Sequence, residues 1–288
     1  MRIAVTGASG RVGRTVVDLL AAGGEHQPVA VSRRAIGPAA SPQVHRAIAD
    51  YDDLAALRAA LRDVDTLVFV SSDGEATKVL VHHQNVIRAA VDCGVAHIVA
   101  LSGLDADLAS PFCYAVTYAY TEQLLRESRC QVSIARASIY AEFFMSWLIQ
   151  ARGSGQLRLP AADGRISLVS HNDVARCLAA LAAAGPTGRH HDITGPEALD
   201  LPTIAALVER EWGTPIAYVD LTPAEYRIET ARAGEDPWWE YAYTTMFDSV
   251  REQRWAAVSD QVLRLTGRPP MPLRTVLAHH DPGRGQLA

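Results

Sequence analysis

The chain has 288 residues, of which 49% are hydrophobic and 20% are charged, and its net charge is −5. This composition is typical of a globular protein with ample core. Lys78 is the only lysine and no basic stripe occurs, which argues against a nucleic-acid partner. No apolar run reaches the roughly 18–20 residues of a membrane span, so we expect no membrane partner. The first apolar run begins at residue 2 and the four cysteines are scattered, which favours a cytoplasmic protein without a signal peptide.

The first 34 residues predict a strand, a glycine-rich turn, a helix and a second strand. The apolar runs are Met1–Thr6 and Pro28–Ser32, and between them lie the G-x-x-G-x-x-G turn of Gly7–Gly13 and an amphipathic segment, Arg14–Ala22. This order predicts a βαβ unit with the glycines where the pyrophosphate of a dinucleotide would lie. A merely structural turn is the less favoured interpretation.

Each glycine of the turn has a separate physical role. Gly7 lets the chain turn sharply off the strand, Gly10 has no Cβ to keep phosphates from the backbone, and Gly13 lets the helix pack closely. The helix N-terminus then offers unpaired N–H groups to the anion. The predicted pyrophosphate-binding residues are Gly7, Ala8, Ser9, Gly10, Arg11, Val12 and Gly13.

The end of the second strand predicts which cofactor binds. NAD sites usually place a carboxylate there for the ribose 2′-hydroxyl, whereas NADP sites place an arginine near the 2′-phosphate. This chain has Ser32-Arg33-Arg34 and no carboxylate. NADP(H) is therefore favoured, with Arg33 on the phosphate; the alternative is that both arginines are simply solvated.

Regular alternation of strands and helices continues as far as Arg136. Uniformly apolar strands that alternate with helices are typical of a doubly wound parallel sheet, so the fold class predicted is α/β, Rossmann-like. The predicted strands are 44–48, 66–70, 97–101 and 131–135, and the predicted helices are 54–61, 75–93 and 115–128.

Beyond Arg136 the pattern changes to helices, with a strand expected at 166–169, a helix capped by His171-Asn-Asp173, and a strand at 191–194 that returns to the sheet. We predict a Rossmann core over 1–136, rejoined by the strand near 190–195. A smaller, mostly helical substrate lobe would be discontinuous, over 137–189 and 196–288. Its last residues, 281–288, are predicted to be frayed.

Seven short motifs, spread in order over nearly the whole chain, together resemble one family. They are Val5–Gly13, Asp50-Tyr51, Ser71-Ser72, Asn85–Ala90 with Gly94-Val95, Ser170–Ala175, Ile193–Pro196 and Leu265–Pro270. The chain resembles the atypical short-chain dehydrogenase/reductases of the NmrA-like group, particularly the type-2 NAD(P)H:quinone oxidoreductases.

The resemblance implies further site residues. Asp50 and Tyr51 would lie near the adenine, and Ser71 and Ser72 near the nicotinamide-side ribose. The loop that begins at Ala137 would close over the nicotinamide and a planar or aromatic substrate, while Glu142 either bonds the substrate or is solvated. Aromatic residues outside the core predict a flat pocket, or else ordinary lobe core. The predicted substrate residues are Ser138, Ile139, Tyr140, Glu142, Phe143 and Trp238.

The chain departs from the Tyr-x-x-x-Lys pair of the classical short-chain dehydrogenase/reductases, a pair that similar quinone-reducing relatives also lack. Tyr114 is followed four residues later by Tyr118, and Tyr118 by Glu122. A carboxylate there would raise the pKa of the Tyr118 phenol instead of lowering it, so the standard ketone relay is not expected. Tyr118 paired with Ser102 could orient a carbonyl; otherwise Tyr118 is a half-buried helix tyrosine.

We therefore predict an NADPH-dependent oxidoreductase that transfers hydride to a quinone or a similar conjugated carbonyl. A quinone can accept hydride directly and take its proton from water, so positioning supplies much of the catalysis. The alternatives are a non-catalytic NADP(H)-binding redox sensor, and a natural-product tailoring reductase or isomerase. No metal site is predicted, because the three adjacent histidine pairs point to different faces. A homodimer is left open.

Overall fold

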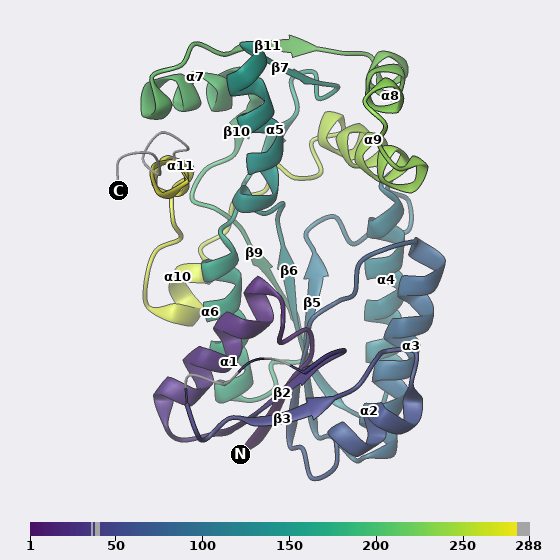
Figure 1. The fold of residues 1–288 in the computed structure, drawn as a ribbon. Coiled ribbons are helices and arrows are strands. Elements are labelled where there is room, and N and C mark those ends of the chain that lie inside the picture. The colour runs from purple at the N-terminus through teal and green to yellow at the C-terminus, as the bar shows by residue number, and fades with distance from the viewer. Residues whose placement is uncertain (36, 38–40, 281–288) are drawn as a thin grey trace.

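A seven-stranded parallel sheet forms the centre of the computed structural model, which describes residues 1–35, 37 and 41–280. The segment 281–288, predicted to be frayed, lies outside the described residues. The strand order is β3-β2-β1-β4-β5-β6-β9 (Figure 1), and every pair is parallel. The predicted doubly wound sheet is confirmed, with β9 as the returning strand. The strands are β1 Arg2–Val5, β2 Gln27–Ser32, β3 His45–Ile48, β4 Thr66–Phe69, β5 His97–Gly103, β6 Gln131–Ala137 and β9 His190–Ile193.

Helices cover both faces of the sheet. α1 (Arg11–Gly23) and α6 (His171–Ala184) pack on one face, and α2 (Leu54–Ala60), α3 (Ala76–Asp92) and α4 (Cys113–Glu127) cover the other. Alternate residues of a strand point to opposite faces. Ile3 and Val5 accordingly pack with α1, whereas Ala4 between them packs with α2 and α3.

Helix α6 lies on the sheet side of the molecule, although the predicted substrate lobe included its residues. It packs beside α1 and against the sheet, and α10 (Gln261–Thr266) packs on it in turn. Small side chains on its inner face, such as Ala175 and Ala182, allow this close approach. The chain therefore returns to the sheet with α6, before β9.

The substrate lobe is mostly helical, as predicted, and also contains two small sheets. β7 pairs with β11 in parallel and β8 with β10 antiparallel. The strand predicted at 166–169 forms only as far as Ile166, because Val169 makes a single bridge to Tyr140 instead. The elements are α5 Ala141–Ser154, β7 Gln156–Leu159, β8 Arg165–Ile166, β10 Leu199–Asp200, α7 Leu201–Trp212, β11 Ala217–Asp220, α8 Pro223–Arg232, α9 Pro237–Arg251 and α11 Leu273–His279.

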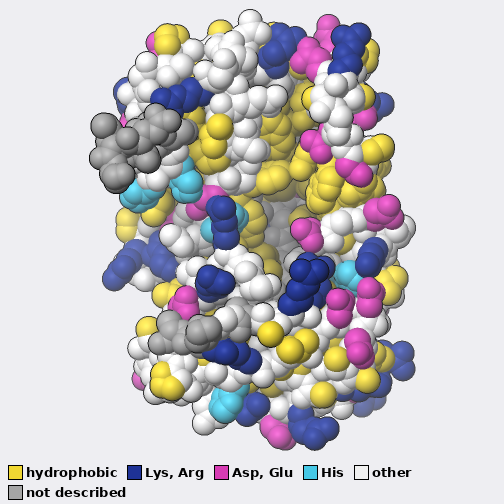
Figure 2. Space-filling view, viewed as in Figure 1, with side chains coloured by type: hydrophobic (Ala, Val, Ile, Leu, Met, Phe, Trp, Pro, Cys, Tyr) yellow, Lys and Arg dark blue, Asp and Glu magenta, His cyan; other side chains and the backbone are white. Residues whose placement is uncertain are grey.

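The lobe sits over the carboxyl ends of the sheet strands, and the surface is hollowed between the two halves (Figures 1 and 2). Apolar side chains gather at the rim of this hollow beside the lobe. Within the described ranges, none of the helices is long and apolar enough to cross a bilayer.

Candidate active site

A cavity of about 780 Å³ lies where the strands β1 to β6 end and the substrate lobe begins. In a doubly wound sheet this crevice is the usual place for ligands. Its lining combines the glycine turn, the loops after β2, β3 and β4, and aromatic side chains from α4, α5 and α9. One continuous space therefore joins the predicted cofactor residues to the predicted substrate residues.

The glycine turn has the shape that a dinucleotide diphosphate needs. Gly7 has a φ of +63°, which few residues other than glycine adopt. A Cβ on Gly13 would lie 2.4 Å from the carbonyl oxygen of Gly7, so α1 can start this close only with glycine there. The α1 N-cap, Gly10, contributes no side-chain hydrogen bond, which leaves N–H groups for an anion. Of the predicted turn residues, Ala8 is buried and does not line the cavity, whereas the others do.

Arg33 lies at the mouth of the same cavity. Its side chain is exposed, and it lines the cavity while the neighbouring Arg34 does not. The Ser32 hydroxyl donates to the Arg34 carbonyl oxygen over 2.6 Å and turns the chain after β2. A guanidinium in this position can bind a 2′-phosphate.

The residues predicted to lie near the adenine are held by their own hydrogen bonds. The Tyr51 hydroxyl donates to the Val70 carbonyl oxygen over 2.7 Å, and burial raises the pKa of this phenol. The Asn85 amide donates to the Tyr51 carbonyl oxygen over 2.9 Å. Asp50 and Tyr51 both line the cavity, and their place near the adenine stays a prediction.

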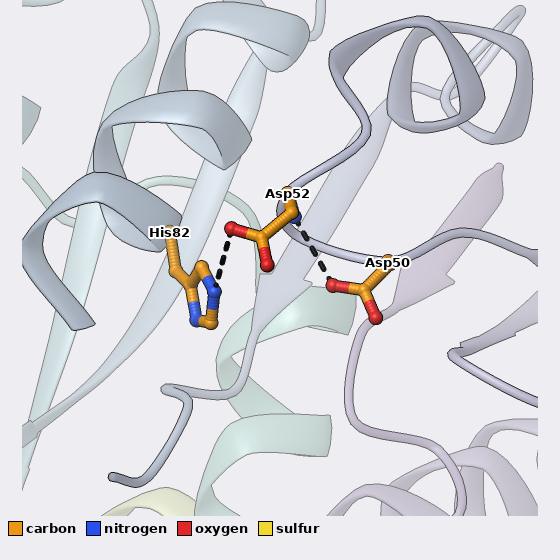
Figure 3. A group of neighbouring side chains, drawn as sticks. All are labelled: Asp50, Asp52 and His82. Carbon is orange, nitrogen blue, oxygen red and sulfur yellow. Dashed lines mark hydrogen bonds and ion pairs between the residues drawn. The ribbon is translucent and has the colours of Figure 1, made fainter. Parts of the chain in front are cut away.

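His82, which the sequence analysis did not single out as a site residue, connects the loops after β3 and β4, and Figure 3 shows it beside Asp52 and Asp50. Its Nε2 lies 3.0 Å from Asp52 Oδ1, and its Nδ1 lies 3.0 Å from the Ser72 hydroxyl. Asp50 Oδ1 accepts from the Asp52 backbone N–H over 3.1 Å. Asp50, Asp52 and His82 lie close enough to share a cation, but the Lys78 ammonium, 3.5 Å from Asp52, already supplies positive charge. We interpret the group as a hydrogen-bonded brace between two cofactor-side loops.

Ser102, a predicted catalytic residue, lines the cavity but does not pair with Tyr118. Its hydroxyl donates to Glu122 Oε1 over 2.8 Å. The Glu122 carboxylate is buried and also accepts from Arg136, at 2.6 and 2.8 Å, and from Arg126 at 2.7 Å. The predicted Ser102–Tyr118 pair is therefore wrong, because ion pairs hold Glu122 against Ser102.

Tyr118 borders the cavity with its ring packed on the end of β5. A Cβ on Gly103 would lie 2.5 Å from this ring, so glycine there makes room for the phenol. The pKa of Tyr118 is raised, mainly by burial and further by Tyr114 and Cys113. The predicted direction is confirmed, but the predicted cause is wrong, since Glu122 is not what raises this pKa.

The loop after β6 and the first turn of α5 supply four of the predicted substrate residues to the cavity: Ser138, Ile139, Tyr140 and Phe143. Glu142 does not line it. Its carboxylate accepts from the His171 backbone N–H at 3.0 and 3.1 Å and lies 3.5 Å from His171 Nδ1. Trp238 also lies outside the lining, because its indole N–H donates to the Tyr114 hydroxyl over 3.4 Å.

The structure adds site residues that the sequence analysis did not assign to the site. His171 lines the cavity with its ring 4.3 Å from the Tyr140 ring, centroid to centroid, and burial lowers its pKa. The Tyr114 hydroxyl holds the loop after β4 through the backbone of Gly74. The further aromatic and apolar lining residues are Phe112, Trp239, Tyr243, Met246 and Trp255.

Comparison with known proteins identifies the family. The sequence profile of the NAD(P)H-binding family matches residues 7–184. Quinone oxidoreductase 2 of Escherichia coli is 33% identical over 237 residues, which cover 81% of this chain and 82% of that protein. The chain belongs to the NAD(P)H-binding family. The resemblance predicted from the motifs is thereby confirmed, and the protein is an NAD(P)H-dependent oxidoreductase.

One further relative and one solved structure match nearly the whole chain. A (4-alkanoyl-5-oxo-2,5-dihydrofuran-3-yl)methyl phosphate reductase of Streptomyces griseus is 30% identical over 285 residues, 96% of this chain and 97% of that protein. The crystal structure of the Escherichia coli quinone oxidoreductase with NADPH superposes with a TM-score of 0.89 at 28% identity, covering 96% of this chain and 99% of that one. Neither relative favours the predicted redox-sensor alternative over an enzyme.

Proposed function

We propose that the protein uses NADPH to reduce a quinone or a similar planar conjugated carbonyl by direct hydride transfer. Bound NADPH supplies one hydrogen with two electrons; water supplies the proton that completes the hydroquinone. The glycine turn would hold the diphosphate, Arg33 the 2′-phosphate, and Asp50 with Tyr51 the adenine. The loop from Ser138 to Phe143 would cover the nicotinamide and the substrate.

The observation that carries this proposal is the aromatic inner end of the cavity. Tyr118, Tyr140, Phe143, Trp239 and Tyr243 line it, and flat faces of this kind favour flat substrates. The same space continues to the glycine turn, so a planar molecule there can lie against a nicotinamide. Positioning of two partners in one site accelerates a reaction that needs little acid–base help.

The charged side chains of the cavity lining also bear on the charge of the substrate. The basic side chains among its residues are Arg11, Arg33, His82 and His171, and the two arginines belong to the cofactor end. Burial lowers the pKa of His171, which disfavours its cationic form. An uncharged quinone therefore suits the inner end better than a phosphorylated butenolide such as the substrate named for the Streptomyces griseus relative. A substrate panel should contain both compound classes, because turnover of the phosphorylated butenolide would support the alternative of a tailoring reductase.

The first test is NADPH oxidation at 340 nm by the purified protein with a panel of quinones, beside NADH. We expect NADPH to be preferred, and Arg33→Glu to lower the NADPH-over-NADH preference at least about tenfold, because hydrogen bonds to charged groups contribute about 1.5–3 kcal/mol. Turnover with NADH should stay close to that of the unaltered protein.

Arg34→Glu is the matched control, because Arg34 is the adjacent exposed arginine and does not line the cavity. We expect it to leave the preference unchanged. An unchanged preference in Arg33→Glu would contradict the 2′-phosphate assignment. NADPH binding without turnover of any quinone would contradict the substrate proposal.

We also propose that the protein acts in the cytoplasm, where its four unpaired thiols would stay reduced. Fractionation of the native host cells tests this location. The homodimer that the sequence left open stays a prediction, and sedimentation equilibrium tests it.

A further inference from the structure

The hydroxyl groups that line the cavity differ in whether their hydrogen is free. A hydroxyl has one hydrogen to donate and two lone pairs that accept. When the protein takes the hydrogen, a ligand can only donate to that oxygen. Assigning each hydrogen therefore shows which wall can bind a carbonyl oxygen, which is an acceptor.

Two serines at the strand ends have given their hydrogen to the protein. Ser71 donates to the Leu101 carbonyl oxygen over 2.8 Å, and Ser102 donates to Glu122, whose carboxylate can only accept. Ser72 lies 3.0 Å from Nδ1 of His82, and the tautomer of the ring decides which of the two donates.

Ser138 is different. The Ser167 hydroxyl donates to the Ser138 hydroxyl over 3.1 Å, while the Trp255 carbonyl oxygen accepts from the Ser167 backbone N–H over 3.0 Å. Ser138 therefore keeps its own hydrogen, and the serine wall that presents only lone pairs consists of Ser71 and Ser102.

The tyrosines of the cavity divide into two groups. Tyr51 and Tyr114 donate to the carbonyl oxygens of Val70 and Gly74. Among the residues that the structure describes, no protein acceptor takes the hydroxyl hydrogen of the remaining cavity tyrosines. These are Tyr118, Tyr140 and Tyr243.

Tyr118 and Tyr140 both lie near the carboxyl ends of two neighbouring strands, β5 and β6. Tyr118 packs on Gly103, the last residue of β5, and Gly103 pairs with Ala137, three residues before Tyr140. Tyr118 lies near enough to Tyr140 to contribute, after burial, to the raised pKa of the Tyr140 phenol. Tyr243 lies apart from them on α9, where its ring stacks on Trp239.

We propose that the hydroxyls of Tyr118 and Tyr140 form the oxygen-binding subsite of the cavity, and that both donate to the carbonyl oxygen of the substrate. This inference rests on the proposed function. Hydride adds to the conjugated carbonyl, and the displaced π electrons collect on its oxygen. The two phenols stabilise this negative charge and stay neutral, while water delivers the proton. The serine wall instead accepts from donors such as ribose hydroxyls.

The kinetic test compares Tyr118→Phe and Tyr140→Phe with Tyr120→Phe. We expect each of the first two to lower kcat for 1,4-naphthoquinone roughly tenfold to a hundredfold, near the lower end of what loss of one oxyanion donor costs. The dissociation constant for NADPH, measured by fluorescence titration, should not change. Tyr120 lies on the same helix as Tyr118 and does not line the cavity, so its variant should match the unaltered protein.

A spectroscopic test needs no turnover. In the NADP⁺-loaded protein, the infrared carbonyl stretch of bound 1,4-naphthoquinone should lie below its value in an apolar solvent, and should move back in both phenylalanine variants. An unmoved stretch in the variants would overturn the subsite, even with active enzyme. A moved stretch without NADPH oxidation would support the subsite and overturn the proposed reaction. Failure of naphthoquinone to bind would overturn both.

Discussion

The contact between Gly13 and Gly7 shows how closely α1 approaches the turn before it. The position a Cβ would take on Gly13 is 2.4 Å from the Gly7 carbonyl oxygen and 2.7 Å from the carbonyl carbon. Backbone atoms at that distance cannot move aside without moving β1. The geometry of the turn, and with it the position of the N–H groups proposed to bind phosphate, therefore depends on Gly13 having a hydrogen atom where alanine would have a methyl group.

Gly13→Ala should lower the free energy of unfolding by about 1–3 kcal/mol, the usual cost of overpacking, and weaken NADPH binding because the turn must shift. Urea unfolding and fluorescence titration measure the two effects. Gly23→Ala is the control on the same helix, since a Cβ there meets nothing within 4 Å. We expect Gly23→Ala to be neutral or to stabilise by up to about 1 kcal/mol. Equal behaviour of the two variants would refute the argument.

Single residues were predictable from sequence where their role is local. The glycine spacing and Arg33 needed only the order strand, turn, helix, strand. The choice between Trp238 and Trp239 depends on how α9 is rotated against α4, which no local pattern records. The partner of Ser102 depends on Arg136 from β6, because this arginine holds Glu122 in place.

Among the elements, α6 connects the cavity to the sheet. The Ser170 side chain caps its first turn by accepting from the Asp173 N–H over 3.0 Å, and Glu142 accepts from the His171 N–H. The inner face of α6 packs on α1 and on the sheet. Its N-terminus thus fixes His171 at the cavity while its body belongs to the core.

Ser170→Ala should cost about 1 kcal/mol of unfolding free energy, the typical value of an N-cap, and should loosen His171. Thermal unfolding measures the first effect, and hydrogen exchange of the His171 and Asp173 amides measures the second. Ser146→Ala on α5 is the control, because its side chain is exposed within a helix; we expect a change of no more than about 0.5 kcal/mol. A cap that contributed nothing would leave Ser170→Ala as stable as Ser146→Ala.

Element types were predicted well where the hydrophobic pattern is long, as in α3 and α4. The lobe strands β7 and β11 were not predicted, because they have only four residues each and lie about sixty residues apart in the chain. These two segments are strands because they pair with each other in the folded protein. α1 begins at Arg11, earlier than the predicted Arg14, directly after its extended N-cap Gly10, so that Gly13 already lies in its first turn.

Across the whole molecule, buried histidines make stability depend on pH. Burial lowers the pKa of His83 to about 3 and that of His97 to about 4. In the unfolded chain both imidazoles titrate near 6.5. Protonation therefore favours the unfolded state, so the stability present above pH 6.5 is lost progressively as the pH falls from 6.5 toward these lower values.

At pH 5 each of these imidazoles should cost about 2 kcal/mol of unfolding free energy relative to pH 7.5. Urea unfolding at a series of pH values measures the slope. His97→Gln should reduce the slope, whereas His45→Gln should not, because His45 is exposed. A slope that His97→Gln leaves unaltered would show that His97 does not remain neutral in the folded protein.

The path of the chain through the two halves also bears on how such proteins can diversify. The glycine turn and Arg33 lie in one continuous stretch of 33 residues or so at the start, so a single recombination event between related genes can exchange them together. The aromatic walls come from α4, α5 and α9, with β6, α6 and β9 between them in sequence. A single crossover before α4 exchanges the aromatic walls only together with the strands and helices between them and everything that follows. The cofactor end can therefore be inherited as a short block, whereas the pocket is inherited only with more than half of the chain.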